Sequence, residues 1–480
     1  MNFIGGRWCA ALDGRTYMRP NPARPDDVIG YFPDSGPADA ESAARSAARA
    51  YPAWRDMVPA ARGEVLQRAG DLIFGRVDEL AAALTREEGK PLALARGEVE
   101  RCADVFRYFA GEALRHGGTT LPSARPGAVL STWAEPLGPV LLITPFNFPF
   151  FIAALKLGAA LGAGNTAVWK PSPHVPVSSI ELMSALSSAG LPDGVVNLVH
   201  GPRPELGQAL VDDPVIRAIS FTGSTAVGLA VGVRGAARHV RVQQEMGGKN
   251  VLVIGPDVDL EVAARIAAEG AFGESGQKCT ATGLVIVDRR RADLLVSEVG
   301  AVLSGMLMGD GARPGVDIGP LIDARAREKA ERLLDSAVSE GATVAVQGCP
   351  LARPELDGGY FFAPRVVRLP DGPSPLRHTE AFAPIMSIVA ADDAVEAGLQ
   401  AIADSGMGLS ASVLTARLDL AHTFAQRAEA GLVNVNLPTT GVEYQAPFGG
   451  WNQSGGPFPE AGQTALDFFT RRKTIAFRAP

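Results

Sequence analysis

The chain has 480 residues, of which 46% are hydrophobic, so it can fill the cores of about three domains or of two large ones. Lysine and arginine total 45 against 52 for aspartate and glutamate, which gives a net charge of -7 and argues against nucleic acid as a partner. The longest apolar region, 148–164, contains Lys156 and is shorter than the roughly 20 residues that span a bilayer, so no membrane partner is expected.

The N-terminal part of the chain is predicted to be mainly helical after a turn at 21–25. One helix is expected over 37–54, one or two more over 62–88, and another over 93–115. The next stretch, 116–135, is less regular and carries short β-leaning pieces. No basic segment followed by an apolar run opens the chain, so a signal peptide is not expected and a cytoplasmic location is predicted.

From residue 138 onward, short apolar runs alternate with longer segments rich in alanine and leucine. This alternation of strands and helices predicts a mostly parallel sheet covered on both faces, with ligands beyond the carboxyl ends of the strands. The elements predicted for the first series are strands at 140–143, 166–169, 195–199 and 218–221, and helices at 150–161 and 177–189.

A second alternating series follows and predicts a second α/β domain, which carries Cys279. Its predicted strands include 250–254, 411–414 and 431–436. Close to the C-terminus, 466–470 and 473–477 are also predicted to be strands.

Cys279 follows a glycine turn at Gly276 and precedes a strand-like run, 284–287. Taken alone, a free thiol usually behaves as a small buried hydrophobe. Upstream, however, Glu245 precedes a pair of glycines that would let backbone lie close to a ligand. The thiol and the carboxylate form a candidate nucleophile–base pair. The other cysteines and the histidines lack the spacing of a metal site, so no metal is predicted.

Both segments, in this order, resemble the aldehyde dehydrogenase superfamily. The resemblance covers nearly the whole chain, because further motifs of the family stand in the family's order. They are TPFNFP at 144–149, WKPS at 169–172, FTGSTAVG at 221–228, EAFAP at 380–384 and PFGG at 447–450.

The resemblance implies an α/β fold made of three parts. A Rossmann-type cofactor domain would comprise 1–117 and 136–246, and an α/β catalytic domain would comprise 247–440. A small β oligomerisation flap would comprise 118–135 and 455–480, with the chain end returning to the flap of a neighbouring subunit. A homodimer or homotetramer is the implied assembly.

The resemblance also implies oxidation of an aldehyde to a carboxylic acid through a cysteine hemithioacetal and a thioester. Cys279 would be the nucleophile, and Glu245 would activate the water that hydrolyses the thioester. The side-chain amide of Asn147 and the backbone N–H of Cys279 would bind the oxyanion. Lys170 belongs to the same set of functional residues. Without the motif, Asn147 would be read as a turn residue between two prolines.

NAD or NADP is the implied cofactor, and alternative interpretations of its motifs stay open. Phe221-Thr222-Gly223-Ser224 could also be a strand–helix turn with a serine N-cap, Lys170 a surface lysine and Glu380 a solvated loop charge. Pro173 stands where NAD-preferring relatives carry a glutamate, so NADP should be tolerated and is a candidate for the preferred cofactor. The cofactor-binding residues predicted are Thr144, Phe146, Lys170, Ser172, Gly223, Ser224, Gly228, Glu380 and Phe382.

Some segments, among them 436–445, are similar to the 2-oxoglutarate semialdehyde (2,5-dioxopentanoate) dehydrogenase branch of the family. Such a substrate carries a carboxylate, for which Arg107, Arg115 or Lys278 could be the cationic partner. The residues predicted to line the substrate tunnel are Phe148, Phe151, Ile152, Lys278, Thr280 and Tyr444. Two alternatives are a coenzyme A-acylating aldehyde dehydrogenase and a non-catalytic structural relative.

Overall fold

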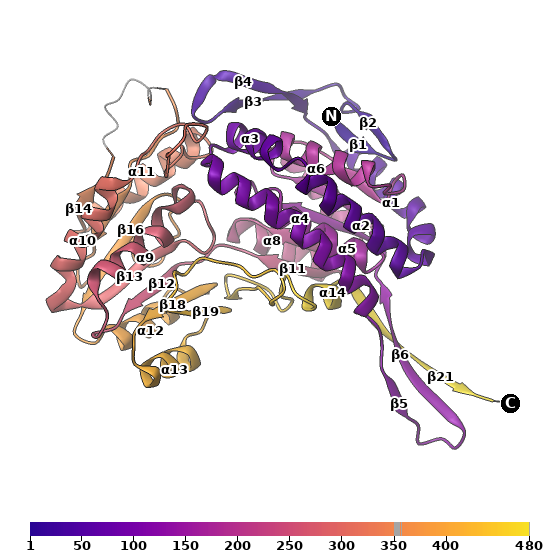
Figure 1. The fold of residues 1–480 in the computed structure, drawn as a ribbon. Coiled ribbons are helices and arrows are strands. Elements are labelled where there is room, and N and C mark those ends of the chain that lie inside the picture. The colour runs from indigo at the N-terminus through magenta and orange to yellow at the C-terminus, as the bar shows by residue number, and fades with distance from the viewer. Residues whose placement is uncertain (350–355, 357, 480) are drawn as a thin grey trace.

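The fold comes from a computed structural model, which describes residues 1–349, 356 and 358–479. Within this part of the chain two seven-stranded sheets stand side by side, and a three-stranded sheet extends away from them (Figure 1). The first sheet has the order β11 (Arg241–Glu245), β10 (Ala218–Thr222), β7 (Pro139–Thr144), β8 (Thr166–Pro171), β9 (Val196–Leu198), β1 (Asn2–Ile4), β2 (Arg7–Cys9). Its first five strands are parallel, and β1 and β2 add antiparallel pairs.

Helices cover both faces of the first sheet because alternate residues of each strand are apolar on opposite sides. Leu141, Val168 and Ile219 pack against one group of helices, whereas Leu142 and Trp169 pack against the other. The first group is α1 (Pro37–Asp56), α7 (Pro204–Asp212) and α8 (Thr225–Ala237). The second group is α2 (Pro59–Phe74), α3 (Val77–Glu88), α4 (Leu92–Arg115), α5 (Phe151–Gly162) and α6 (Pro176–Ser188).

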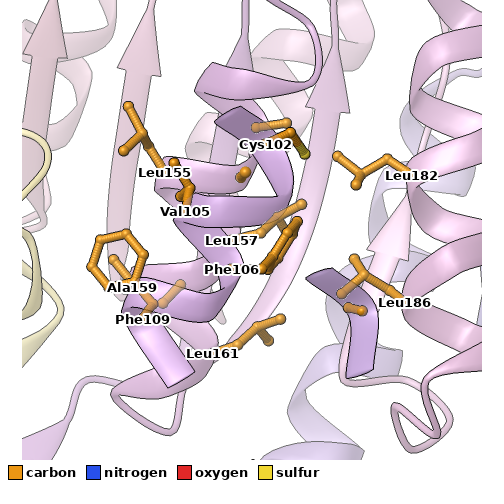
Figure 2. Packing of buried hydrophobic residues seen from close by; sticks show 14 of the residues in the cluster. Cys102, Val105, Phe106, Phe109, Leu155, Leu157, Ala159, Leu161, Leu182 and Leu186 are labelled. Atoms are coloured by element: carbon orange, nitrogen blue, oxygen red, sulfur yellow. The ribbon is translucent and has the colours of Figure 1, made fainter. Parts of the chain in front are cut away.

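Helix α4 is central to this second layer. Its side chains from Cys102 to Phe109 lie among leucines of α5 and α6 (Figure 2). At Gly158 the two helices come so close that an added Cβ would lie 2.7 Å from the ring of Phe109. This contact fixes the distance between α4 and α5, and α5 carries predicted site residues at its start.

The second sheet is also mostly parallel and covered on both faces. Its order is β14 (Thr343–Gln347), β15 (Arg365–Arg368), β16 (Ile385–Ala391), β13 (Thr282–Asp288), β12 (Asn250–Ile254), β18 (Ser410–Leu414), β19 (Leu432–Val435). The covering helices are α9 (Leu260–Phe272), α10 (Ala292–Gly305), α11 (Ala324–Ser339), α12 (Ala394–Asp404) and α13 (Leu418–Arg427). Two smaller pairs are β3 (Thr16–Asn21) with β4 (Arg24–Pro33) and β17 (Met407–Gly408) with β20 (Trp451–Asn452).

The extended sheet contains β5 (Thr120–Pro122), β6 (Ala128–Pro136) and β21 (Thr470–Arg478), and β21 pairs with β6 of the same chain. The chain end thus lies in the flap of its own chain, and contact of this flap with a neighbouring subunit stays a prediction. The prediction of a strand at 466–470 was wrong, because α14 (Thr464–Phe468) occupies most of it. Ala465, Phe468 and Phe469 are buried while Asp467 is exposed, which is a helical and not an alternating pattern. No helix in the described ranges is long and apolar enough to cross a membrane.

Candidate active site

A cavity of about 610 Å³ is lined by the carboxyl ends of β10 and β11, the start of α5 and the loop that carries Cys279. In parallel sheets these strand ends are where ligands bind. The cavity brings together most of the predicted site residues, although they come from distant parts of the chain. Those in its wall are Phe146, Asn147, Phe148, Phe151, Ile152, Ser172, Gly223, Ser224, Glu245, Lys278, Cys279, Thr280, Glu380 and Phe382.

The wall formed by the described residues leaves out four predicted positions: Thr144, Lys170, Gly228 and Tyr444. Thr144 Oγ1 accepts a hydrogen bond from Trp169 Nε1 at 2.9 Å. Lys170 lies at the same sheet edge, and burial lowers the pKa of its ammonium to about 8. A Cβ at Gly228 would lie 2.4 Å from Met246 Sδ, and Tyr444 packs on the ring of Tyr108.

The loop before Cys279 has an unusual backbone. Glu274, Ser275 and Gly276 have φ of 54°, 56° and 67°, so three consecutive residues are left-handed. At Gly276 an added Cβ would lie 2.4 Å from the carbonyl oxygen of Ala383, so only glycine fits. After the turn, Asn250 Nδ2 donates to the carbonyl oxygens of Cys279 and Ala281, each at 2.8 Å. These contacts fix the position of the thiol.

The Cys279 thiol is held in its protonated form. Burial raises its pKa to about 12, and the charges of Glu380 and Glu245 raise it as well. A nucleophilic thiolate therefore requires a base to remove the proton.

Asn147 lies directly beside the cysteine loop. Its Nδ2 donates to the carbonyl oxygen of Gln277 at 2.9 Å, which uses one of its two N–H groups. The backbone carbonyl oxygen of Asn147 accepts a hydrogen bond from Lys90 Nζ at 2.7 Å. Both contacts are buried, so one hydrogen bond holds the side-chain amide and another holds the backbone of this residue.

Lys90 is the centre of a buried charge cluster. Its Nζ lies 2.5 Å from Glu98, 3.4 Å from Glu88 and 3.7 Å from Glu274. Burial lowers the pKa of Lys90, but the three carboxylates outweigh it and raise the pKa above its ordinary value. Glu98 also accepts hydrogen bonds from the backbone N–H groups of Phe150 and Phe151. The cluster thus connects the start of α5 to the cysteine loop.

Glu245 ends β11, directly opposite Thr222 of β10. Its carboxyl is buried, and burial followed by the nearby charge of Glu460 raises its pKa well above the ordinary value. Glu460 forms an ion pair with Lys156 at 2.5 Å, and both side chains are buried. The Glu245 carboxylate is therefore a stronger base than an exposed glutamate.

The opposite part of the cavity carries features that fit a dinucleotide. Ser224 is the N-cap of α8 and lines the cavity, so the helix N-terminus and its free N–H groups face it. Among the described residues no hydrogen-bond partner faces the buried Thr222 Oγ1. Glu380 accepts from the backbone N–H of Gly248 at 3.3 Å, and burial raises its pKa to about 7. An added Cβ at Gly247 would lie 2.1 Å from Glu380, so this approach requires glycine.

Residues 8–475 match the model of the aldehyde dehydrogenase family. The chain belongs to this family. It is 36% identical over 475 residues to an alpha-ketoglutaric semialdehyde dehydrogenase of Bacillus subtilis (99% of this chain, 97% of the relative). It is 38% identical over 477 residues to an alpha-ketoglutarate semialdehyde dehydrogenase of Haloferax volcanii (99% and 98%). Among solved structures, betaine aldehyde dehydrogenase from Staphylococcus aureus in complex with NAD+ superposes with a TM-score of 0.96 at 30% identity (99% and 94%).

The prediction of an NAD(P)-dependent aldehyde dehydrogenase with an α/β fold is therefore confirmed. The observed glycines, the N-terminus of α8 and the unpartnered Thr222 hydroxyl all fit its cofactor, NAD or NADP.

Sequence reasoning missed several charged residues of this aldehyde dehydrogenase. Three of them, Lys90, Glu98 and Glu460, lie outside the family motifs used for prediction. Only their burial in the structure distinguishes them from surface charges. Arg101 also lines the cavity, whereas Arg107 and Arg115, the two arginines considered for a substrate carboxylate, do not. They pair instead with acidic residues of the helical layer: Asp71, Asp104 and Glu112.

Proposed function

We propose that Cys279, Glu245 and Asn147 carry out the oxidation of the aldehyde. Glu245 takes the thiol proton, and Cys279 Sγ attacks the aldehyde carbon to give a hemithioacetal. The side-chain amide of Asn147 and the backbone N–H of Cys279 donate to the oxyanion. NAD(P), when bound, supplies the hydride acceptor. The observation that carries this proposal is that all three residues line one cavity.

The same carboxyl group then supports release of the acid. Once the thiol proton has left Glu245 for solvent, its carboxylate accepts a proton from a water molecule, and the water oxygen bonds to the thioester carbon. The C–S bond breaks, which frees the carboxylic acid and returns the sulfur of Cys279 as a thiolate. The raised pKa of Glu245 supports this double use, because a higher pKa makes its carboxylate a stronger base.

For the cofactor, we propose that Gly223, Ser224 and Gly228 position the pyrophosphate, and that Glu380 with Phe382 holds the nicotinamide ribose. Lys170 and Ser172 would bind the adenosine ribose. Thr144 and Phe146 complete the predicted set. Pro173 leaves room for a 2'-phosphate without repulsion, so NADP is expected to be accepted beside NAD.

We propose a semialdehyde that carries a carboxylate, such as 2-oxoglutarate semialdehyde, as the substrate. The names of the relatives from Bacillus subtilis and Haloferax volcanii support this choice. Phe148, Phe151, Ile152, Lys278 and Thr280 would contact it, since all five line the cavity. Tyr444 would support the tunnel through its contact with Tyr108.

We further propose the domain limits given by the sequence: 1–117 with 136–246, 247–440, and 118–135 with 455–480. Exposed apolar side chains on the extended sheet support a homodimer or homotetramer, and they include Leu121, Val129, Trp133 and Phe477. The cytoplasmic location stays a prediction.

Absorbance of reduced nicotinamide, measured with aldehydes and NAD or NADP, tests the proposed function. We expect turnover and free acid without coenzyme A for the parent protein, and no signal for Cys279→Ser. Glu245→Gln should be strongly impaired because the glutamine amide cannot accept the proton of the thiol or of the water. A strict requirement for coenzyme A would instead support the acylating alternative.

A further inference from the structure

Arg101 is placed on the wall of the substrate part of the cavity by α4. Its guanidinium stacks on the ring of Phe151, with 4.3 Å between the Arg101 Cζ and the ring centroid. One N–H group of Arg101 donates to the carbonyl oxygen of Val442. A guanidinium carries five N–H donors, so others are left for a ligand. Stacking on Phe151 fixes the plane of the Arg101 guanidinium before a ligand binds.

Lys278 is the other cation on this part of the wall. Its side chain folds over Gly273, where an added Cβ would lie 3.1 Å from Nζ. Among the described residues neither an ion-pair partner nor a hydrogen-bond partner is found for its ammonium. Burial lowers the pKa of Lys278, while Glu274 and Glu269 raise it. The ammonium is therefore next to Cys279 without a direct counter-ion.

Among the described residues, none of the carboxylates on the same wall forms an ion pair with Arg101 or Lys278. Glu274 lies 3.7 Å from Lys90, which it shares with Glu98 and Glu88. Glu269 is exposed, and water screens its charge. Glu245 is the proposed base, and Glu460 is the carboxylate whose charge raises the pKa of Glu245. Glu380 lies in the cofactor part of the cavity. The guanidinium of Arg101 is thus left without an ion-pair partner among the described residues.

We propose that Arg101, with Lys278, forms the site that binds the carboxylate of the substrate and makes the enzyme prefer anionic over neutral aldehydes. This inference rests on the proposed function, because the aldehyde must enter the same cavity. A carboxylate accepts two parallel N–H groups from a guanidinium, which orients the substrate as well as attracting it. With one end held at Arg101, the aldehyde end is directed toward Cys279.

A different role for Arg101 is structural, since its bond to Val442 fastens the loop 440–442 to α4. The two roles differ in their consequences. Loss of a structural contact would impair every aldehyde, whereas loss of a carboxylate ligand would impair only anionic ones. Arg107 is the matched control, because it lies on the same helix but pairs with Asp71 and Asp104 away from the cavity.

The experiment compares kcat/KM for glutarate semialdehyde and for pentanal, which have the same number of carbons, in the parent enzyme and in Arg101→Met, Arg101→Lys and Arg107→Met. We expect Arg101→Met to lower kcat/KM for the semialdehyde roughly 10- to 150-fold and to leave pentanal within about twofold. Arg101→Lys should recover part of the loss, and Arg107→Met should keep the parent's ratio. Inhibition of pentanal oxidation by glutarate, a dicarboxylate product analogue, should weaken in Arg101→Met.

Equal losses for both aldehydes in Arg101→Met would overturn the inference in favour of the structural role. Unchanged selectivity and unchanged inhibition by glutarate would overturn it as well, while aldehyde oxidation would still stand. If none of the aldehydes supports reduction of NAD(P) by the parent enzyme, the proposed function itself is refuted, and the inference with it. Should Arg101→Met fold poorly, the selectivity ratio of Arg101→Lys and the glutarate inhibition of the parent decide the question.

Discussion

Replacement of Lys90 by methionine tests whether the buried charge cluster maintains the cavity. None of the Lys90 side chain is exposed (0%), and Glu98 lies 2.5 Å from its Nζ. Removal of one partner of a buried ion pair typically costs about 3–5 kcal/mol, because the remaining charge is left without compensation. Methionine has a similar volume, so the loss reports the charge and not a cavity. We expect the free energy of unfolding to fall by this amount at neutral pH.

The cost should depend on pH. Without Lys90, the buried Glu98 binds a proton instead of staying an isolated anion, so its pKa, already raised by burial, rises further above the unfolded value. Between these two pKa values the folded variant holds a proton that the unfolded chain has released. Stability is therefore greatest at low pH and falls by about 1.4 kcal/mol per pH unit for one proton as the pH rises through this window.

Thermal melting at pH 6 and pH 8 measures both effects. Lys90→Met should melt below the parent at each pH, with the larger difference at pH 8. In addition, kcat should fall because the backbone carbonyl of Asn147 loses its hydrogen bond, which helps to position this residue. The control is Lys473→Met, which breaks an exposed ion pair with Glu135 and should cost no more than about 1 kcal/mol. A difference that is the same at both pH values, or no larger than in the control, would refute the reasoning.

Three further predictions concern the cavity. Glu380→Gln should speed alkylation of Cys279 by iodoacetamide at pH 8, because the charge of Glu380, which raises the thiol pKa, is gone, while steady-state turnover falls; slower alkylation would contradict this. Gly276→Ala should lower the melting temperature more than Gly14→Ala, since both have positive φ but only the first meets a backbone oxygen; equal shifts in melting temperature would count against it. Pro173→Glu should lower kcat/KM with NADP at least about tenfold relative to NAD, and an unchanged ratio would exclude the proposed place of the 2'-phosphate.

The alternation of apolar runs and helical segments predicted the α/β architecture because it follows from local periodicity. Both large sheets are mostly parallel and covered on both faces, as the pattern indicates for strands such as β7 and β12. The prediction of a strand at 466–470 was wrong for a related reason. Its aromatic residues Phe468 and Phe469 favour a strand by propensity, but their burial together with Ala465 in the packed chain selects a helix.

Motifs located the thiol, the carboxylate and the amide, since each has a distinctive neighbourhood in the sequence. The charged residues that surround them have no distinctive neighbourhood in the sequence. Arg101 and Arg107 both belong to α4, yet one lines the cavity and the other pairs with Asp71 on the outside of the layer. Only the crossing of α4 over the start of α5 decides which arginine faces the substrate. This is a tertiary fact that no local pattern contains.

The same argument explains why substrate choice is harder to predict than reaction type. The reaction type depends on the Cys279 thiol and the Glu245 carboxylate. The cysteine loop and the end of β11 place these two groups at one cavity. Substrate choice depends on charges that reach this point from other layers, where Glu274 shares Lys90 with Glu98 and Glu88, and no described residue forms an ion pair with Lys278. The sign of the potential felt by the aldehyde's far end is thus set by the pairing of buried carboxylates, so selectivity can change without any change to Cys279 or Glu245.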